Sequence, residues 1–592
     1  MNEKWILEAK RADFQQIGTQ LGISPVLARI IVNRGYRSIE EMNRYLECNL
    51  SMLHNARLMK DMEKAVGMII SAIQSKKKIA IGTDFDNDGI ISGYILHKAI
   101  TRVGGEVFLY APDRVTEGYG LNRRIVDDAF EEGCSLVITC DNGIAAFDAI
   151  SYAKSLGMTV IVTDHHEIGF EEMDSGERRY VLPEADAIVN PKQPNCPYPF
   201  KGLCGAGIAF KLILCLYEEF SISKYEAYEL LEYTAIATVA DVMDLVDENR
   251  IIVKHGLNQL RNTKNIGLRA LIDECSIQME RISAYHIGFV IGPCFNAAGR
   301  LNTVAMAFDL LQATNENEAI TLAKKLRELN EERKNMTLRG LEQAIELIEN
   351  SDRKNDKVLV VLLKDTHESL VGIIAGRLRE NYHKPAIVCV ETEHGIKGSG
   401  RSIEAYNMFE ELIKCKDLLG KFGGHPMAAG LSLPFDQFEA LRKRLNENTT
   451  LTEADFVPIV RIDVPLPVGE LSLTFLEELE LLEPFGKGNV KPIFAEQHFA
   501  IRQAKVLGKN QNVLKLMLSN QVGCPIEALY FGDIKEFLGF VEQEFGEEES
   551  RKMFQGKFNA IDLAFTYYPT VNDYMGKQTI QIVIQNYCRI KN

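Results

Sequence analysis

Three carboxylates stand at alternate positions in one short stretch of the sequence. Asp84, Asp86 and Asp88 directly follow an apolar run, and a glycine comes after the last of them. An EF-hand calcium loop begins with a similar pattern, but it needs a glutamate at its twelfth position and a helix before it. The twelfth residue here is Ile95 when counted from Asp84 and His97 when counted from Asp86. Because a predicted strand also precedes the stretch, the EF-hand interpretation is excluded.

Two further polar clusters occur at equivalent places. Asp141 follows Leu-Val-Ile-Thr-Cys, and Asp164, His165 and His166 follow Val-Ile-Val-Thr. A single aspartate after a strand is usually a turn or cap residue. Three such groups after successive strands instead favour a site, because the functional crevice of an open α/β sheet lies at the carboxyl ends of its strands. Carboxylates with imidazoles suit Mn²⁺ or Mg²⁺, and less specifically Zn²⁺, and two ions ~3.5–4 Å apart would clamp a phosphoryl group.

The elements that position these residues alternate as expected for a parallel, doubly wound sheet. Short apolar runs predict the strands, and amphipathic stretches that stop at glycine predict the helices. The predicted strands cover 79–83, 107–110, 136–139 and 158–163, and the predicted helices cover 90–103, 124–132 and 145–156.

Three further regions follow this sheet. A long polar helix over 316–349 connects it to a second α/β unit that begins near residue 357. After about residue 455, short strands and turns predict a small antiparallel barrel. The expected division is an N-terminal helical segment (1–50), the first α/β domain (51–275), a linker with the long helix (276–350), the second α/β domain (351–450) and the barrel (451–592).

The composition is that of a globular protein with an acidic balance. Of the 592 residues, 67 are Lys or Arg and 82 are Asp or Glu, so the net charge is −15. Hydrophobic residues make up 46%, which excludes a disordered or collagen-like chain. The twelve cysteines include no C-x-x-C pair, so we expect reduced, buried thiols and no zinc ribbon. We expect no membrane span and no signal peptide, and therefore a cytoplasmic protein.

The ordered set of motifs resembles the DHH phosphoesterase superfamily and, within it, the RecJ family of single-strand-specific 5′-to-3′ DNA exonucleases. The four superfamily motifs match residues 84–89, Asp141, residues 164–166, and Asp241 in Ala-Thr-Val-Ala-Asp-Val-Met-Asp-Leu. The narrower resemblance rests on segments 117–122, 198–207, 296–301 (Asn-Ala-Ala-Gly-Arg-Leu), 398–402 (Gly-Ser-Gly-Arg-Ser), 422–425 and 483–489 (Glu-Pro-Phe-Gly-Lys-Gly-Asn).

The resemblance implies a hydrolase that depends on Mn²⁺ or Mg²⁺, with a DHH domain, a DHH-associated domain and an OB-type barrel. Asp141 matches the ligand that bridges both ions, and His166 the residue that meets the substrate phosphate or steadies the site. Asp164 would orient an imidazole. The implied catalytic and metal-binding positions are Asp84, Asp86, Asp88, Asp141, His165, His166 and Asp241.

The implied reaction is in-line hydrolysis of single-stranded DNA from the 5′ end, with release of 5′-mononucleotides in DNA repair and recombination. A single-strand-binding protein and a RecQ-type helicase are the implied partners, and a monomer is favoured. The implied substrate-binding residues are Arg114, Tyr119, Asn296, Arg300, Ser399, Arg401 and His425, with Lys487, Lys491, Arg502, Lys505, Lys509 and Lys515 as candidates on the barrel.

Three positions depart from the family pattern. Cys294 stands where arginine is usual, Asp365-Thr366 lacks the usual Gly-Trp, and Thr83 replaces glycine. They bear on strand affinity and substrate choice, since a thiol cannot replace a guanidinium in gripping phosphate. The alternatives are a phosphodiesterase for short oligonucleotides or cyclic dinucleotides, a single-strand-binding scaffold without activity, and a pyrophosphatase. The intact acidic set disfavours the scaffold, and the long C-terminal half disfavours the pyrophosphatase.

Overall fold

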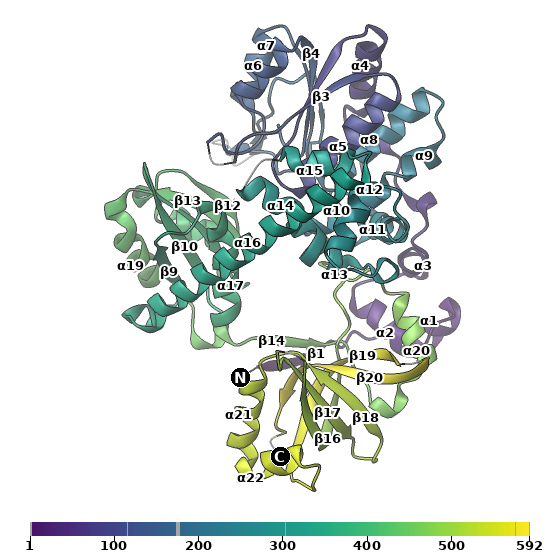
Figure 1. Cartoon of the computed structure of the whole chain (residues 1–592), viewed down its shortest axis with the longest axis vertical. Helices are drawn as coiled ribbons and strands as arrows, with labels where there is room; N and C mark the ends of the chain where they lie inside the picture. The colour runs from purple at the N-terminus through teal and green to yellow at the C-terminus, as the bar shows by residue number, and fades with distance from the viewer. Residues whose placement is uncertain are drawn as a thin grey trace.

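The computed structural model describes residues 3–114, 116–172, 178–301, 304–508, 510–574 and 576–590. It contains two α/β domains and a β-barrel, and Figure 1 shows the first α/β domain at the top and the barrel at the bottom. The helix α16 (Glu316–Glu349) runs from the first domain into the second and has the predicted bounds. Among the described residues, none of the helices combines the length and apolar character that a membrane span needs.

The first domain is built on a parallel sheet in the order β3-β2-β4-β5-β8. Successive side chains of a strand point to opposite faces, so Ile79 and Ile81 pack in one core and Ala80 in another. The predicted elements between 79 and 163 are present, with ends that differ by up to three residues. The strands are β2 (Lys78–Gly82), β3 (Glu106–Tyr110), β4 (Cys134–Cys140), β5 (Thr159–Thr163) and β8 (Ala187–Val189); α4 (Met62–Gln74), α5 (Asn87–Arg102) and α8 (Gly205–Glu219) cover one face, and α6 (Arg123–Glu131) and α7 (Phe147–Ser155) the other.

A group of shorter helices packs between α8 and α16. Three of them, α10, α14 and α15, contact α5, and the contact with α10 brings the end of that helix to the acidic stretch at the start of α5. A π-helical turn, Ile287–Ile291, joins α13 to α14. The bounds are α9 (Lys224–Tyr228), α10 (Leu231–Ala240), α11 (Asp247–Leu260), α12 (Ile266–Glu274), α13 (Ala284–His286), α14 (Gly292–Leu301) and α15 (Ala305–Gln312).

The second α/β domain has a mixed sheet in the order β12-β13-β11-β10-β9. The end of α16 packs with α17 on one face, and α18 and α19 pack on the other. The elements are β9 (Leu359–Leu363), α17 (Val371–Tyr382), β10 (Ala386–Thr392), β11 (Gly395–Arg401), α18 (Met408–Ile413), β12 (Phe422–His425), β13 (Ala428–Leu433) and α19 (Phe438–Asn448).

The C-terminal domain is a barrel of five strands, closed where β16 pairs with β19. The expected barrel is therefore present, but it is not wholly antiparallel, because β18 and β20 pair in parallel. The elements are β16 (Phe494–Leu507), β17 (Val513–Ser519), β18 (Pro525–Tyr530), α21 (Ile534–Phe545), α22 (Glu547–Phe554), β19 (Asp562–Tyr574) and β20 (Lys577–Cys588).

The N-terminal segment differs from the expectation of a purely helical unit. Its first element is a strand, β1 (Lys4–Leu7), which pairs in parallel with β14 (Ile459–Ile462). The helices α1 (Phe14–Leu21), α2 (Pro25–Asn33) and α3 (Ile39–Glu47) follow, and Leu27 and Tyr45 belong to the same hydrophobic core as the barrel. The two ends of the chain therefore pack together, a contact that no local pattern in the sequence encodes.

Candidate metal centre

The acidic and histidine side chains converge from the ends of five elements. The turn from β2 into α5 is fixed by Asp86, whose Oδ1 accepts a hydrogen bond from the Gly89 N–H at 3.1 Å and so caps the helix. Asp84 lies in that turn, Asp88 in the first turn of α5, Asp141 directly after β4, His165 and His166 after β5, and Asp241 at the C-terminal cap of α10.

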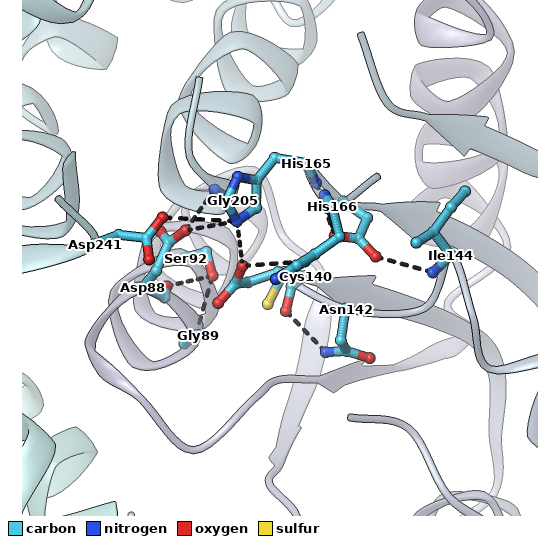
Figure 2. Close-up of polar contacts among 12 residues, drawn as sticks. Asp88, Gly89, Ser92, Cys140, Asn142, Ile144, His165, His166, Gly205 and Asp241 are labelled. Carbon is cyan, nitrogen blue, oxygen red and sulfur yellow. Dashed lines mark hydrogen bonds and ion pairs between the residues drawn. The ribbon is translucent and has the colours of Figure 1, made fainter. Parts of the chain in front are cut away.

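These side chains form three overlapping groups, in each of which one ligand atom per residue lies within 4.8 Å of the others. His165 Nε2 lies 3.0 Å from Asp141 Oδ1. It lies 3.7 Å from both Asp88 Oδ2 and Asp241 Oδ2 (Figure 2). Asp141 belongs to two of the groups, so it stands between two candidate cation positions. The groups are Asp84 with Asp86 and Asp141, Asp88 with His165 and Asp241, and Asp141 with His165 and His166.

The N-terminus of α8 holds Asp88 in place. The backbone N–H groups of Gly205 and Ala206 donate to its two carboxylate oxygens at 2.6 and 2.8 Å. A Cβ on Gly205 would lie 2.6 Å from Asp141 Cβ, so this close approach needs glycine. Sequence reasoning did not find this contact, because more than a hundred residues separate Asp88 from Gly205.

His166 is oriented by Asp164 and Tyr119. Asp164 Oδ1 accepts from His166 Nδ1 at 2.7 Å, and Asp164 Oδ2 accepts from the Ile144 N–H at 2.9 Å. The hydroxyl of Tyr119 donates to the Asp141 carbonyl at 2.7 Å and lies near the His166 ring. Burial disfavours the imidazolium, but the hydrogen bond and charge of Asp164 raise the pKa of His166 to about 8. His166 is therefore well suited to face an anion.

In the absence of a cation, each carboxylate of the centre disfavours the ionised form of its neighbours. Burial and the charge of Asp86 raise the pKa of Asp88 to about 6 and raise that of Asp84 as well. Burial and neighbouring carboxylates also raise the pKa values of Asp141 and Asp241. Carboxylates buried this close together ionise together only when positive charge compensates them.

The chemistry of the donor set fits divalent cations. Neither carboxylate oxygen of Asp84 is exposed to water or has a hydrogen-bond partner of good geometry. Burial lowers the pKa of His165 to about 3, so its imidazole is neutral and able to ligate. A set of five carboxylates and one neutral imidazole suits Mn²⁺ or Mg²⁺ better than softer ions.

A basic cavity adjoins this centre. Arg114, Arg300, Ser399 and Arg401 line a cavity of about 560 Å³ between the first and second domains. The guanidinium of Arg114 lies 4.5 Å from the centre of the Phe85 ring, which stands between Asp84 and Asp86 in the sequence. Burial and the nearby arginines lower the pKa of Arg300 to about 9. The cavity therefore has a surplus of positive charge that an anion would neutralise.

The remaining predicted substrate residues lie at different depths. Asn296 Oδ1 accepts from the Asn87 N–H at 2.8 Å, so Asn296 steadies the start of α5. His425 is exposed at the end of β12 and is not among the residues that line the basic cavity. Cys294 is fully buried, and its thiol donates to the Val290 carbonyl at 3.2 Å. Cysteine in place of the usual arginine at residue 294 therefore affects the buried packing around α14. It does not affect the lining of the basic cavity.

The basic residues predicted on the barrel are mostly engaged within the protein. Arg502 donates to the Ser519 hydroxyl, and Lys515 pairs with Glu527. Lys505 is exposed, and Lys509 lies outside the described residues. The other two lie near the first strand of the barrel, where Lys491 Nζ stands 3.7 Å from the centre of the Tyr568 ring and Lys487 pairs with Asp244.

Comparison with known proteins matches three domain families in chain order. The DHH family N-terminal domain matches residues 78–238, the DHHA1 domain 355–450 and the RecJ OB domain 462–586. The chain is 37% identical over 523 residues to the single-stranded-DNA-specific exonuclease RecJ of Bacillus subtilis, an alignment that covers 88% of this chain and 64% of that protein.

Two further relatives match over more of their length. The chain is 32% identical over 586 residues to the single-stranded-DNA-specific exonuclease RecJ of Escherichia coli, and the alignment covers 95% of this chain and 96% of that protein. The structure of RecJ from Thermus thermophilus in complex with Mn²⁺ superimposes with a TM-score of 0.81 at 25% identity, over 100% of this chain and 80% of that one.

Proposed function

Because the chain belongs to the RecJ family, we propose that it is an exonuclease that hydrolyses single-stranded DNA from the 5′ end, with two Mn²⁺ or Mg²⁺ ions, in DNA repair and recombination. The observation that supports the proposal most strongly is the position of Asp141, which belongs to two of the three groups of the centre and lies 3.0 Å from His165 Nε2, a member of the third. A carboxylate shared in this way suits a pair of cations and the single phosphoryl group between them.

The residues of the metal centre would have different roles in hydrolysis. Asp84, Asp86, Asp88, Asp141, His165 and Asp241 would hold the cations. Bound divalent cations would supply charge that stabilises the phosphoryl oxygens and lowers the pKa of water. Since the imidazolium of His166 is held by Asp164 and the pKa of His166 is raised, His166 would donate a hydrogen bond to a substrate oxygen. The Tyr119 hydroxyl also lies within 3.2 Å of both nitrogens of the ring.

The basic cavity supports a start at a 5′ end. It lies next to the acidic centre, since Arg114 lines the cavity and packs on Phe85. Arg300 and Arg401 add two further guanidinium groups, and Ser399 adds a hydroxyl. These groups suit a terminal phosphate, which carries more charge than a phosphodiester within the strand. A terminal phosphate held there would set the scissile bond close to the strand end and favour release of mononucleotides.

The wider assignment follows from the family. The barrel in the position of an OB domain supports binding of a strand longer than a dinucleotide. We infer a cytoplasmic monomer that works with a single-strand-binding protein and a RecQ-type helicase, which would supply the single strand. Pull-down with each purified partner and sedimentation of the protein alone test these inferences.

The test of the proposal is a comparison of substrates. A long single strand, the same strand in duplex form and a dinucleotide are each incubated with Mn²⁺. We expect mononucleotides to be released from the single strand much faster than from the duplex. Turnover of the dinucleotide without degradation of the long strand would instead assign the protein to the phosphodiesterases of short substrates. Binding of the strand without turnover of any substrate would favour a scaffold.

A further inference from the structure

The segment 483–489 lies between α20 (Leu473–Glu480) and the barrel strand β16, and the proposed reaction uses none of its residues. It contacts the loop 242–246, which directly follows Asp241 of the metal centre. The backbone N–H of Leu245 donates to the Lys487 carbonyl at 2.7 Å. Lys487 Nζ also lies 3.4 Å from Asp244 Oδ1. The segment is therefore bound to the loop through both backbone and side-chain atoms.

Two glycines of the segment permit this close approach. Gly488 has φ 72°, and a Cβ there would lie 2.9 Å from Asp244 Cβ and 3.2 Å from Asp244 Cα. A Cβ on Gly486 would lie 2.7 Å from Leu245 Cδ1. Real Cβ atoms essentially never come within 3.0 Å of another heavy atom, so a side chain at Gly488 would push the Asp244 backbone away, whereas one at Gly486 would displace the Leu245 side chain.

The other side of the segment is anchored on the barrel and on α11. The ring of Phe485 meets the ring of Tyr568 on β19 edge-on, with centroids 6.2 Å apart. The amide of Asn489 is buried and donates to the carbonyls of Leu482 and Pro484. The fully buried Arg250 donates to the Leu482 carbonyl at 2.8 Å. These contacts fix the segment 483–489 to the barrel and α11, so that it can hold the loop 242–246 in place.

The loop itself needs support. Val242 has φ 55°, a left-handed conformation that β-branched residues rarely adopt, and the residue is 59% exposed. Strained backbone of this kind persists only where its surroundings hold it, and it is frequent at functional sites. Asn249 Nδ2 donates to the Asp244 carbonyl at 3.0 Å and supplies one contact. The segment 483–489 supplies the others described above.

We propose that the segment 483–489 is a positioning element of the metal centre: by holding the loop 242–246, it keeps the Asp241 carboxylate where a divalent cation needs it. The barrel domain then contributes to catalysis as well as to strand binding. The proposal rests on the proposed function for the identity of the cation, and its residues act through Asp241 without touching the substrate.

The test is the variant Gly488→Ala, with Gly523→Ala as the matched control. Both glycines have positive φ, but a Cβ on Gly523 meets nothing within 4 Å. We expect Gly488→Ala to weaken Mn²⁺ binding, measured by calorimetry on the full chain, by about tenfold or more, the range typical when a partner of a metal ligand is lost. We expect kcat on single-stranded DNA to fall by a similar factor, KM to stay within about twofold, and Gly523→Ala to match the wild type.

A second measurement keeps the test decisive. Hydrogen–deuterium exchange of the 242–246 amides, in protein without metal, should be faster in Gly488→Ala than in the control. Where Gly488→Ala does not fold, Gly486→Ala replaces it with the same expected direction and a smaller effect, since its Cβ displaces the Leu245 side chain and not the loop backbone. Wild-type Mn²⁺ affinity in a folded variant would overturn the proposal. Because calorimetry needs no DNA, failure of the exonuclease assignment would show separately, as an inactive wild type that still binds Mn²⁺.

Discussion

Asp141 combines an unusual backbone with an unusual set of neighbours. Its φ is 61°, a left-handed conformation that aspartate and asparagine adopt more readily than most residues. The carboxylate is buried, and burial and the surrounding carboxylates raise its pKa. Strain and uncompensated charge at one residue are typical of a functional position. Both are explained when Asp141 serves two cations.

The substitution Asp141→Asn tests the role of the negative charge alone, because asparagine has nearly the same size and tolerates the same backbone conformation. We expect Mn²⁺ affinity and kcat each to fall by more than about 100-fold, since the loss of a shared ligand should exceed the loss of an outer partner. Calorimetry and mononucleotide release measure the two quantities. The exposed Asp148→Asn exchange on α7 is the control and should change neither.

The pKa of Asp88 predicts how stability depends on pH. In metal-free protein its pKa is about 6, above the ordinary aspartate value of about 3.9, so the folded state binds more protons than the unfolded state between these values. The stability that this group contributes is present below about pH 4 and lost as pH rises through about 6. Mn²⁺ compensates the charge and should therefore raise Tm at least about twice as much at about pH 7.5 as at about pH 5. Equal shifts at both pH values would contradict the account.

We expect Arg401 to bind the 5′-terminal phosphate of the DNA strand. We predict that Arg401→Met raises KM at least about tenfold for strands with a 5′-phosphate, because a guanidinium–phosphate contact is a strong charge-assisted one. Strands with a 5′-hydroxyl should be affected less than about twofold. Steady-state kinetics on the two strands measure the difference. Arg444→Met, which removes a surface pair with Asp417 in the same domain, should leave both strands unchanged.

At the scale of elements, the sequence pattern predicts those helices and strands whose formation depends on residues close together in the chain. The helix α16 has the predicted ends, because a run of polar residues with a regular apolar stripe has one stable local structure. The strand ends that hold Asp84, Asp141 and His165 follow from short buried runs with polar residues behind them. Three contacts had no local signal: β1 with β14, the start of α8 with Asp88, and the segment 483–489 with the loop after Asp241. Each joins residues more than a hundred positions apart.

The pairing of β1 with β14 gives a prediction at this scale. The buried Asn33 amide donates to the carbonyls of Glu8 and Asp463, where the two strands end. The variant Asn33→Ala removes the donor to the Asp463 carbonyl and one of the two donors to the Glu8 carbonyl, which Arg29 also contacts, and should cost about 1–3 kcal/mol locally. Hydrogen–deuterium exchange of residues 3–9 and 459–463 should accelerate accordingly. Exchange at the wild-type rate would mean that this amide does not secure the strand pair; Asn350→Ala at the exposed end of α16 is the control.

The three parts of the molecule are joined at different places. The helix α16 links the two α/β domains, and Figure 1 shows the barrel below the first of them. The basic cavity lies between the α/β domains, whereas the segment 483–489 ties the barrel to the first domain. Each domain therefore reaches the metal centre or its border. This arrangement explains how an acidic chain processes DNA, since the positive charge is concentrated where a strand end would enter.

The most direct measurement follows a long single strand with a label on its 5′-terminal nucleotide, incubated with the full chain and Mn²⁺. The account predicts rapid release of the label as a 5′-mononucleotide, loss of that release when a chelator removes Mn²⁺, and loss of both release and Mn²⁺ binding in Asp141→Asn. Label that remains on the shortened strand, because nucleotides leave from the 3′ end, would contradict the account. So would release that persists in Asp141→Asn.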